Sequence, residues 1–181
     1  PGLQARLDGE AWPERGDGQL LLDLQDAQRT LAWARSLPGL EDLLQQAQAS
    51  GQAVLQARWR GGWRQPALQA QLQTPGLGLT LPDGEGGTQN LRVETLDARL
   101  DGQLMGEKPA FELAVTGRAR QGERHLALQL VGSGQGQAPG GDLAAASWDV
   151  QLHPKQLELR DPGLGAETWW VHVPGPLQAH W

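Results

Sequence analysis

The sequence contains no cysteine and no tyrosine, one phenylalanine, one methionine and only two lysines, Lys108 and Lys155. Without cysteine the chain can form no disulfide, no thiolate nucleophile and no cysteine-based zinc site. Because acidic residues outnumber basic ones, the formal net charge is -6 and the pI is near 5.1. Nucleic-acid-binding proteins carry a basic surface, so this charge argues against a nucleic-acid partner. No uninterrupted apolar run approaches the length of about 18 residues that a membrane-spanning helix requires.

The abundant residues indicate many short elements joined by turns. The chain has 181 residues, of which 25 are glycine and 12 are proline, a share that argues against a helix bundle. This length suffices for one domain, and no shift in composition marks a second one. We therefore expect a single β-rich groove module over residues 1–181, which we interpret as a fragment of a longer protein.

Apolar and polar residues alternate along several segments, which is the pattern of a β-strand with one apolar and one polar face. The clearest apolar positions of these runs are Leu3, Ala5 and Leu7; Leu55, Ala57 and Trp59; Leu68, Ala70 and Leu72; Leu126, Leu128 and Leu130; and Trp148, Val150 and Leu152. We count roughly a dozen such strands, which at strand spacing make a long ribbon. The predicted fold is mainly β: an elongated, curled antiparallel sheet, or β-taco, with an open groove and one or two short helices.

Similar sequence segments recur along the chain at residues 3–9, 68–74, 96–102 and 126–132. The last three begin 28 and 30 residues apart, which favours a repeated supersecondary unit. Between the first two copies, Gly61 and Gly62 fit a two-residue turn with positive φ at both positions. Such a turn pairs Arg60 with Trp63, and it places Leu55, Ala57 and Trp59 on the same face as Leu68, Ala70 and Leu72.

Two segments depart from the strand pattern. Residues 26–49 carry leucine and alanine at spacings of three and four, with Asp26 as a candidate N-cap and an interruption at Pro38 and Gly39. We predict that they form a helical insertion of two short amphipathic helices. Residues 133–141 are rich in glycine, glutamine and proline, which predicts a flexible loop.

The sequence offers little that could carry catalysis, a metal or a cofactor. The four histidines, at positions 125, 153, 172 and 180, lie in separate segments, and no HExxH, GxGxxG, GxSxG or phosphate-binding loop is present. Acidic residues on polar rows are better explained by solvation, so we expect neither an enzyme nor a cofactor or metal site. Of the eight tryptophans, most should pack against the sheet. Trp169 and Trp170 are adjacent, so they should point to opposite faces, which predicts that one of them is exposed.

The apolar face of the predicted sheet is the candidate functional surface. If nothing in the chain covers it, it forms an open groove for an apolar client, either lipid or an unfolded apolar strand. Its predicted lining residues are Leu55, Trp59, Leu68, Leu72, Leu126, Leu128, Leu130, Val150 and Leu152, with Leu3 and Leu7 as further candidates. The alternative is a closed β-sandwich or solenoid that acts as a binding or adhesion module for carbohydrate or protein.

Three stretches resemble the TamB family, the translocation and assembly module subunits of Gram-negative bacteria within the AsmA-like group. They are residues 51–72 with Trp59 and Trp63, residues 26–40 with Trp33 and Leu37-Pro38-Gly39-Leu40, and the closing stretch from Trp148 to Trp181. The resemblance spans nearly the whole chain. It rests on the composition and the recurring short segments rather than on one motif.

The resemblance implies a periplasmic segment of a protein that is anchored in the inner membrane by a part outside this chain. It implies a taco-shaped apolar groove that carries phospholipid toward the outer membrane, or that assists the assembly of outer-membrane proteins such as autotransporters. The implied partners are a TamA-like outer-membrane barrel protein, and phospholipid or unfolded outer-membrane protein strands as clients. The resemblance implies no catalytic residues in this chain.

Overall fold

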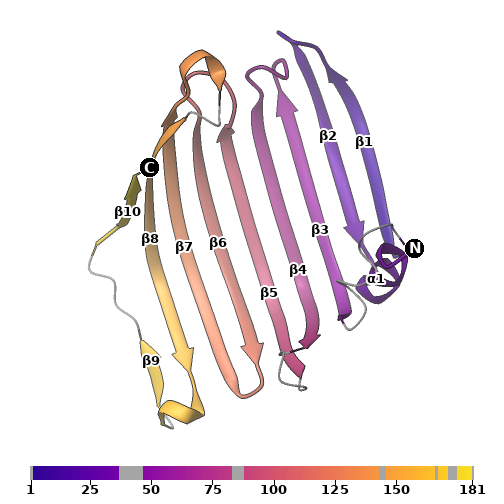
Figure 1. Cartoon of the computed structure of the whole chain (residues 1–181), viewed down its shortest axis with the longest axis vertical. Coiled ribbons are helices and arrows are strands. Elements are labelled where there is room, and N and C mark those ends of the chain that lie inside the picture. The colour runs from indigo at the N-terminus through magenta and orange to yellow at the C-terminus, as the bar shows by residue number, and fades with distance from the viewer. Residues whose placement is uncertain are drawn as a thin grey trace.

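The chain folds into one open antiparallel sheet (Figure 1). The structure, a computed structural model, describes residues 2–36, 47–82, 88–142, 146–165, 167–170 and 175–180. The sheet has ten strands in the order β1-β2-β3-β4-β5-β6-β7-β8-β10, and β9 also pairs with β8. The first eight strands each pair with the next strand along the chain, so the predicted elongated antiparallel sheet is confirmed.

Long strands and short connections build the sheet. The strands are β1 Leu3–Ala11, β2 Gly16–Leu24, β3 Gln48–Arg60, β4 Ala67–Pro82, β5 Thr88–Gln103, β6 Ala110–Gln121, β7 Arg124–Gln137, β8 Ser147–Arg160, β9 Thr168–Trp170 and β10 Leu177–His180. One α-helix, α1 Ala27–Ala34, and the 3-10 turns η1 Pro139–Gly141 and η3 Pro162–Leu164 complete the described elements. The sheet does not close, because β1 and β10 lie at its two ends (Figure 1).

The first of the two predicted helices is present as α1. The Asp26 side chain accepts a hydrogen bond from the Arg29 amide at 3.0 Å, which confirms the predicted N-cap. The Arg35 guanidinium at the end of α1 donates to the Ala47 carbonyl just before β3, so the helix is tied to the sheet. The second predicted helix, after Pro38, lies outside the described residues.

The predicted tight turn at Gly61 and Gly62 is wrong, although the predicted faces are right. Arg60 pairs with Ala67 and Trp59 with Leu68, so the connection spans residues 61–66. Only Gly61 has a positive φ, of 92°, whereas the primed turn needs two. The amide of Gly61 donates to the Gly16 carbonyl and that of Trp63 to the Trp12 carbonyl, so the loop bonds to the β1–β2 hairpin.

Two further predictions are wrong. Residues 133–137 belong to β7 and are not a flexible loop, because their glycines leave room for aromatic rings on the neighbouring strands. A β-carbon on Gly134 would lie 2.3 Å from the Phe111 ring, and one on Gly136 would lie 3.1 Å from the Trp148 ring. The repeat of about thirty residues is not one structural unit either, because the four copies lie on β1, β4, β5 and β7.

Candidate functional site

The register of the strands gathers the apolar residues on one face of the sheet. Residues directly opposite each other on neighbouring strands share a face, so each row can be followed across the sheet. The central row crosses nine strands: Leu7, Leu20, Ala57, Ala70, Leu100, Leu113, Gly132, Leu152 and Leu177. No charged side chain interrupts this row, so the apolar face is continuous from one edge of the sheet to the other.

All nine predicted lining residues lie on this apolar face, in two groups. Leu55 lies opposite Leu72 and Trp59 opposite Leu68, which joins β3 to β4. Leu126, Leu128 and Leu130 on β7, with Val150 and Leu152 on β8, form the second group. Leu3 and Leu7 lie on the same face on β1.

The residues that connect the two groups were missing from the predicted lining. They lie on β5 and β6, in the pairs Leu100 with Leu113 and Ala98 with Val115, while Phe111 lies opposite Gly102. Leu20, Leu22 and Leu24 extend the face over β2. Alternation of apolar with polar residues in 96–100 and 111–115 was the signal that could have found them.

No second layer of the described residues covers the apolar face. The buried hydrophobic residues of the described part are three alanines, Ala27, Ala47 and Ala138. Leucines in the middle of the face are half-buried by their lateral neighbours, whereas Leu7 and Leu177 at the two edges are 71% and 53% exposed. The described strands therefore form one open layer and neither a sandwich nor a solenoid.

The total surface area supports the same conclusion. The chain exposes 12569 Å² of accessible surface at a mass of 19.5 kDa. A compact monomer of that mass would expose about 8,500 Å². The excess is about 4,000 Å² by the same scaling, so the molecule presents far more surface than a closed domain of its size.

The opposite face of the sheet is polar and carries several cavities. A cavity of about 610 Å³ crosses the middle of this face from β3 to β8. Long side chains surround it, and its floor includes the smaller Ala114, Val131 and Ser133; the long residues are Gln56, Arg58, Gln71, Arg99, Glu112 and His153. Two further cavities, of about 500 and 520 Å³, also open on the polar face. Hollows between polar side chains thus lie on the side away from the predicted lining.

Hydrogen bonds organise the charges of the polar face around Asp97 on β5. The carboxylate accepts from Gln73 at 2.9 Å, from Arg99 at 3.2 Å and from Gln71 at 3.2 Å. The bond from Gln73, with smaller contributions from Arg99 and Gln71, holds the pKa of Asp97 below its usual value of 3.8 despite partial burial. Asp97 is therefore a fixed negative charge, held by side chains of two strands.

The described residues contain no candidate metal centre. They contain no group of three or more histidine, cysteine, aspartate or glutamate side chains close enough to bind one ion. His180 on β10 lies 2.8 Å from Asp149 on β8, but both side chains are exposed to solvent. Within the same ranges, no helix is long and apolar enough to cross a membrane.

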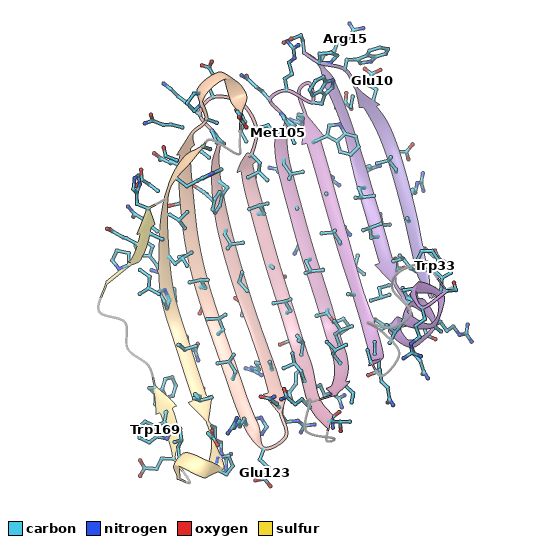
Figure 2. The ribbon with its side chains drawn as sticks, viewed as in Figure 1. Glu10, Arg15, Trp33, Met105, Glu123 and Trp169 are labelled. Carbon is cyan, nitrogen blue, oxygen red and sulfur yellow. The ribbon has the colours of Figure 1, made fainter. Side chains whose placement is uncertain are left out.

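The adjacent tryptophans Trp169 and Trp170 do point to opposite faces, but both are exposed. Trp169 lies opposite Leu159 on the apolar face, and Trp170 lies opposite Glu158 on the polar face. Their exposed fractions are 50% and 68%. Figure 2 shows Trp169 and Glu123 at the same end of the sheet, the end away from Glu10 and Arg15.

Comparison of the chain with protein-family models, curated proteins and solved structures gives no significant match.

Proposed function

We propose that this chain is a non-enzymatic, periplasmic β-groove segment of a TamB-like protein, and that its open apolar face carries the acyl chains of phospholipids. The observation that supports the proposal best is the apolar row that crosses nine strands from Leu7 to Leu177 and that no described residue covers. Large exposed apolar surfaces on soluble domains mark sites for partners, membranes or lipids. The resemblance of the sequence to the TamB family implies that this phospholipid moves toward the outer membrane.

The size of the face suits an acyl chain. Nine strands at a spacing of about 4.8 Å give a row about 38 Å long, which exceeds the length of an extended acyl chain. Leucine, valine and alanine offer methyl and methylene contacts without hydrogen-bonding groups, so a hydrocarbon can slide along the row without losing a specific partner. The head group would stay in water at the open edge of the sheet.

A second client, an unfolded strand of an outer-membrane protein, is supported by the edges of the sheet rather than by its face. An unfolded strand must pair its backbone amides and carbonyls, and a sheet face offers none. Among the described strands, β1 is paired on one side only, by β2, so Leu3–Ala11 presents an edge to which another strand could add. Assistance in outer-membrane protein assembly, with a TamA-like partner, would therefore use β1 while lipid uses the apolar face.

The decisive test is mass spectrometry of lipid extracted from protein purified without detergent. We expect phospholipid in near-stoichiometric amount with the natural chain. Leu128→Asp, which puts a charge on the apolar face, should remove most of it, because a buried carboxylate is costly beside hydrocarbon. Gln129→Asp, on the adjacent residue of the polar face, is the matched control and should retain the lipid.

Strand content from circular dichroism should be the same for both variants, since each leaves the backbone pairing intact. Lipid retained by a folded Leu128→Asp variant would contradict lipid binding on this face. A lipid-free natural chain that forms a tight dimer would instead favour a binding module whose two copies cover each other.

A further inference from the structure

A row of basic residues crosses the polar face near the β6–β7 turn. Four residues lie directly opposite one another, one on each of β5 to β8: Arg92, Arg120, His125 and Arg160. Residues paired in this way have β-carbons about 4.5–5.5 Å apart, so the row spans about 15 Å. Arg118 lies two residues before Arg120 on β6 and adds another guanidinium to the same face.

Among the described residues, no acidic side chain forms an ion pair with this arginine row, defined as Arg92, Arg120, His125 and Arg160. The ion pairs formed within the described ranges do not involve Arg92, Arg118, Arg120 or Arg160. By contrast, Arg124 at the adjacent turn is paired with Asp161 at 2.9 Å. Like charges placed directly opposite each other on a sheet are destabilising, so an anion bound from outside would stabilise the row.

Two glutamates lie near the row without joining it. Glu158 shares a second row with Arg118, through Ala127, and accepts a hydrogen bond from Gln156. Glu94 is the extra residue of the β5 bulge, next to Thr95, which lies opposite Arg118. Both help to line a cavity of about 500 Å³ together with Arg118, His125 and Arg160. The basic groups still outnumber the acidic ones here, although the whole chain carries a net charge of -6.

The same end of the sheet carries exposed apolar side chains. Trp170 lies on the polar face next to Glu158, and Trp169 lies on the apolar face next to Leu159. Leu91 and Leu126, on the apolar face of β5 and β7, are also exposed. Tryptophan is favoured where an apolar ring can enter lipid while its N–H stays at the head groups.

We propose that this end of the sheet, the arginine row with Trp169 and Trp170, docks on the headgroup surface of an anionic phospholipid bilayer. Guanidinium groups match phosphate oxygens with paired N–H donors, and each basic residue near an anionic surface strengthens binding. The flanking tryptophans and leucines favour a bilayer surface over a soluble phosphate ion. This inference is independent of what occupies the middle of the apolar face.

The test compares two triple variants in a vesicle flotation assay with the full chain. The row variant carries Arg92→Gln, Arg120→Gln and Arg160→Gln. The control carries Arg15→Gln, Arg58→Gln and Arg60→Gln. These three arginines form no ion pair with another described residue, and they lie toward the opposite end of the strands, where Figure 2 shows Arg15. Both variants lose three positive charges, so net charge alone cannot separate them.

We expect the natural chain to bind vesicles that contain phosphatidylglycerol and not to bind vesicles of pure phosphatidylcholine. The row variant should bind about 100-fold more weakly, as expected for three basic residues at an anionic surface. The control should change by less than about threefold, because charges separated by more than about 10 Å are screened at 0.1 M salt. Circular dichroism should show the same strand content in all three proteins.

Three results would overturn the proposal. One is equal weakening by the two variants, which would mean that binding follows net charge. Another is a natural chain that does not bind phosphatidylglycerol vesicles. The third is titration calorimetry showing that inorganic phosphate binds at the row while vesicles do not, which would make it a site for a free anion.

Discussion

At the scale of single residues, the polar face is held by local networks such as the one around Asp97. Its carboxylate accepts hydrogen bonds from Gln73 and Gln71 on β4 and from Arg99 on its own strand. Gln69 donates to Asp101 in the same way at 2.6 Å, so glutamine–aspartate pairs link β4 to β5 twice. These pairs explain why the polar rows are rich in glutamine and aspartate.

The depressed pKa of Asp97 predicts a pH-dependent contribution to stability. A carboxyl whose pKa is lower in the folded state stabilises the fold above its unfolded value of 3.8, and this stabilisation is lost as the pH falls below it. Asp97→Asn should therefore lower the free energy of unfolding at pH 7 by less than about 1 kcal/mol, because the Asp97 carboxylate is only partly buried and its partner Arg99 is exposed, so solvent screens the charge.

Urea unfolding at pH 7 and pH 3 measures this contribution. The difference between Asp97→Asn and the natural chain should be smaller at pH 3 than at pH 7, because pH 3 lies below the unfolded pKa of 3.8 and the stabilisation by the ionised carboxyl is being lost there. A difference of the same size at both pH values would show that the carboxylate charge is not what stabilises the fold at this position.

At the scale of elements, packing along the sheet replaces packing between layers. Phe111 on β6 lies across Gly134 of β7, and its ring centroid is 5.9 Å from that of Trp148 on β8. Gly136 leaves similar room for Trp148 and Pro109. Because no second layer is present among the described strands, such lateral contacts are the main apolar packing available to β6, β7 and β8.

Gly134→Val tests this packing. Valine favours strands, so local propensity alone predicts stabilisation, but its side chain would occupy the space of the Phe111 ring. We expect the variant to lose about 1–3 kcal/mol of unfolding free energy, as for an overpacked core. Ser133→Val, on the adjacent and exposed polar-face residue, is the control and should be neutral or stabilising in the same thermal unfolding experiment. Stabilisation by both changes would contradict the packing role of Gly134.

The same elements show what the sequence can and cannot predict. A strand is predicted at residues 126–130 because Leu126, Leu128 and Leu130 alternate with other residues. Gly134 and Gly136 continue that alternation without side chains, so their role becomes visible only beside Phe111 and Trp148. The nine candidate lining residues could be assigned to one face because side chains alternate between the two faces of a strand. A shift of the pairing between two strands by an even number of residues leaves each side chain on the same face.

The arginine row could not be predicted because it depends on register across three strand pairs. Arg120 lies opposite His125 only because the β6–β7 turn has two residues, with Gly122 at a φ of 60°. Arg92 lies opposite Arg120, and Arg160 lies opposite His125, because the pairings of β5 with β6 and of β7 with β8 contain bulges. A bulge adds a residue to one strand, so sequence spacing alone does not give the partner.

At the scale of the whole molecule, the open layer sets how much surface unfolding exposes. The unfolded chain exposes about 28,000 Å², so a compact fold of this mass would bury about 19,700 Å² of it. With 12569 Å² exposed in the folded state, the open sheet buries about four fifths of that amount. The slope of unfolding free energy against urea concentration, the m value, is proportional to the newly exposed surface.

We therefore expect the lipid-free, monomeric chain to have an m value about four fifths of that of compact proteins of 181 residues. Analytical ultracentrifugation under the same conditions identifies the monomer, because dimerisation through the apolar faces would raise the m value. An m value typical of a compact fold, measured on a monomer, would mean that another part of the chain covers the apolar face in solution. That result would remove the physical basis for lipid binding there, but not for docking through the arginine row, which lies on the other face.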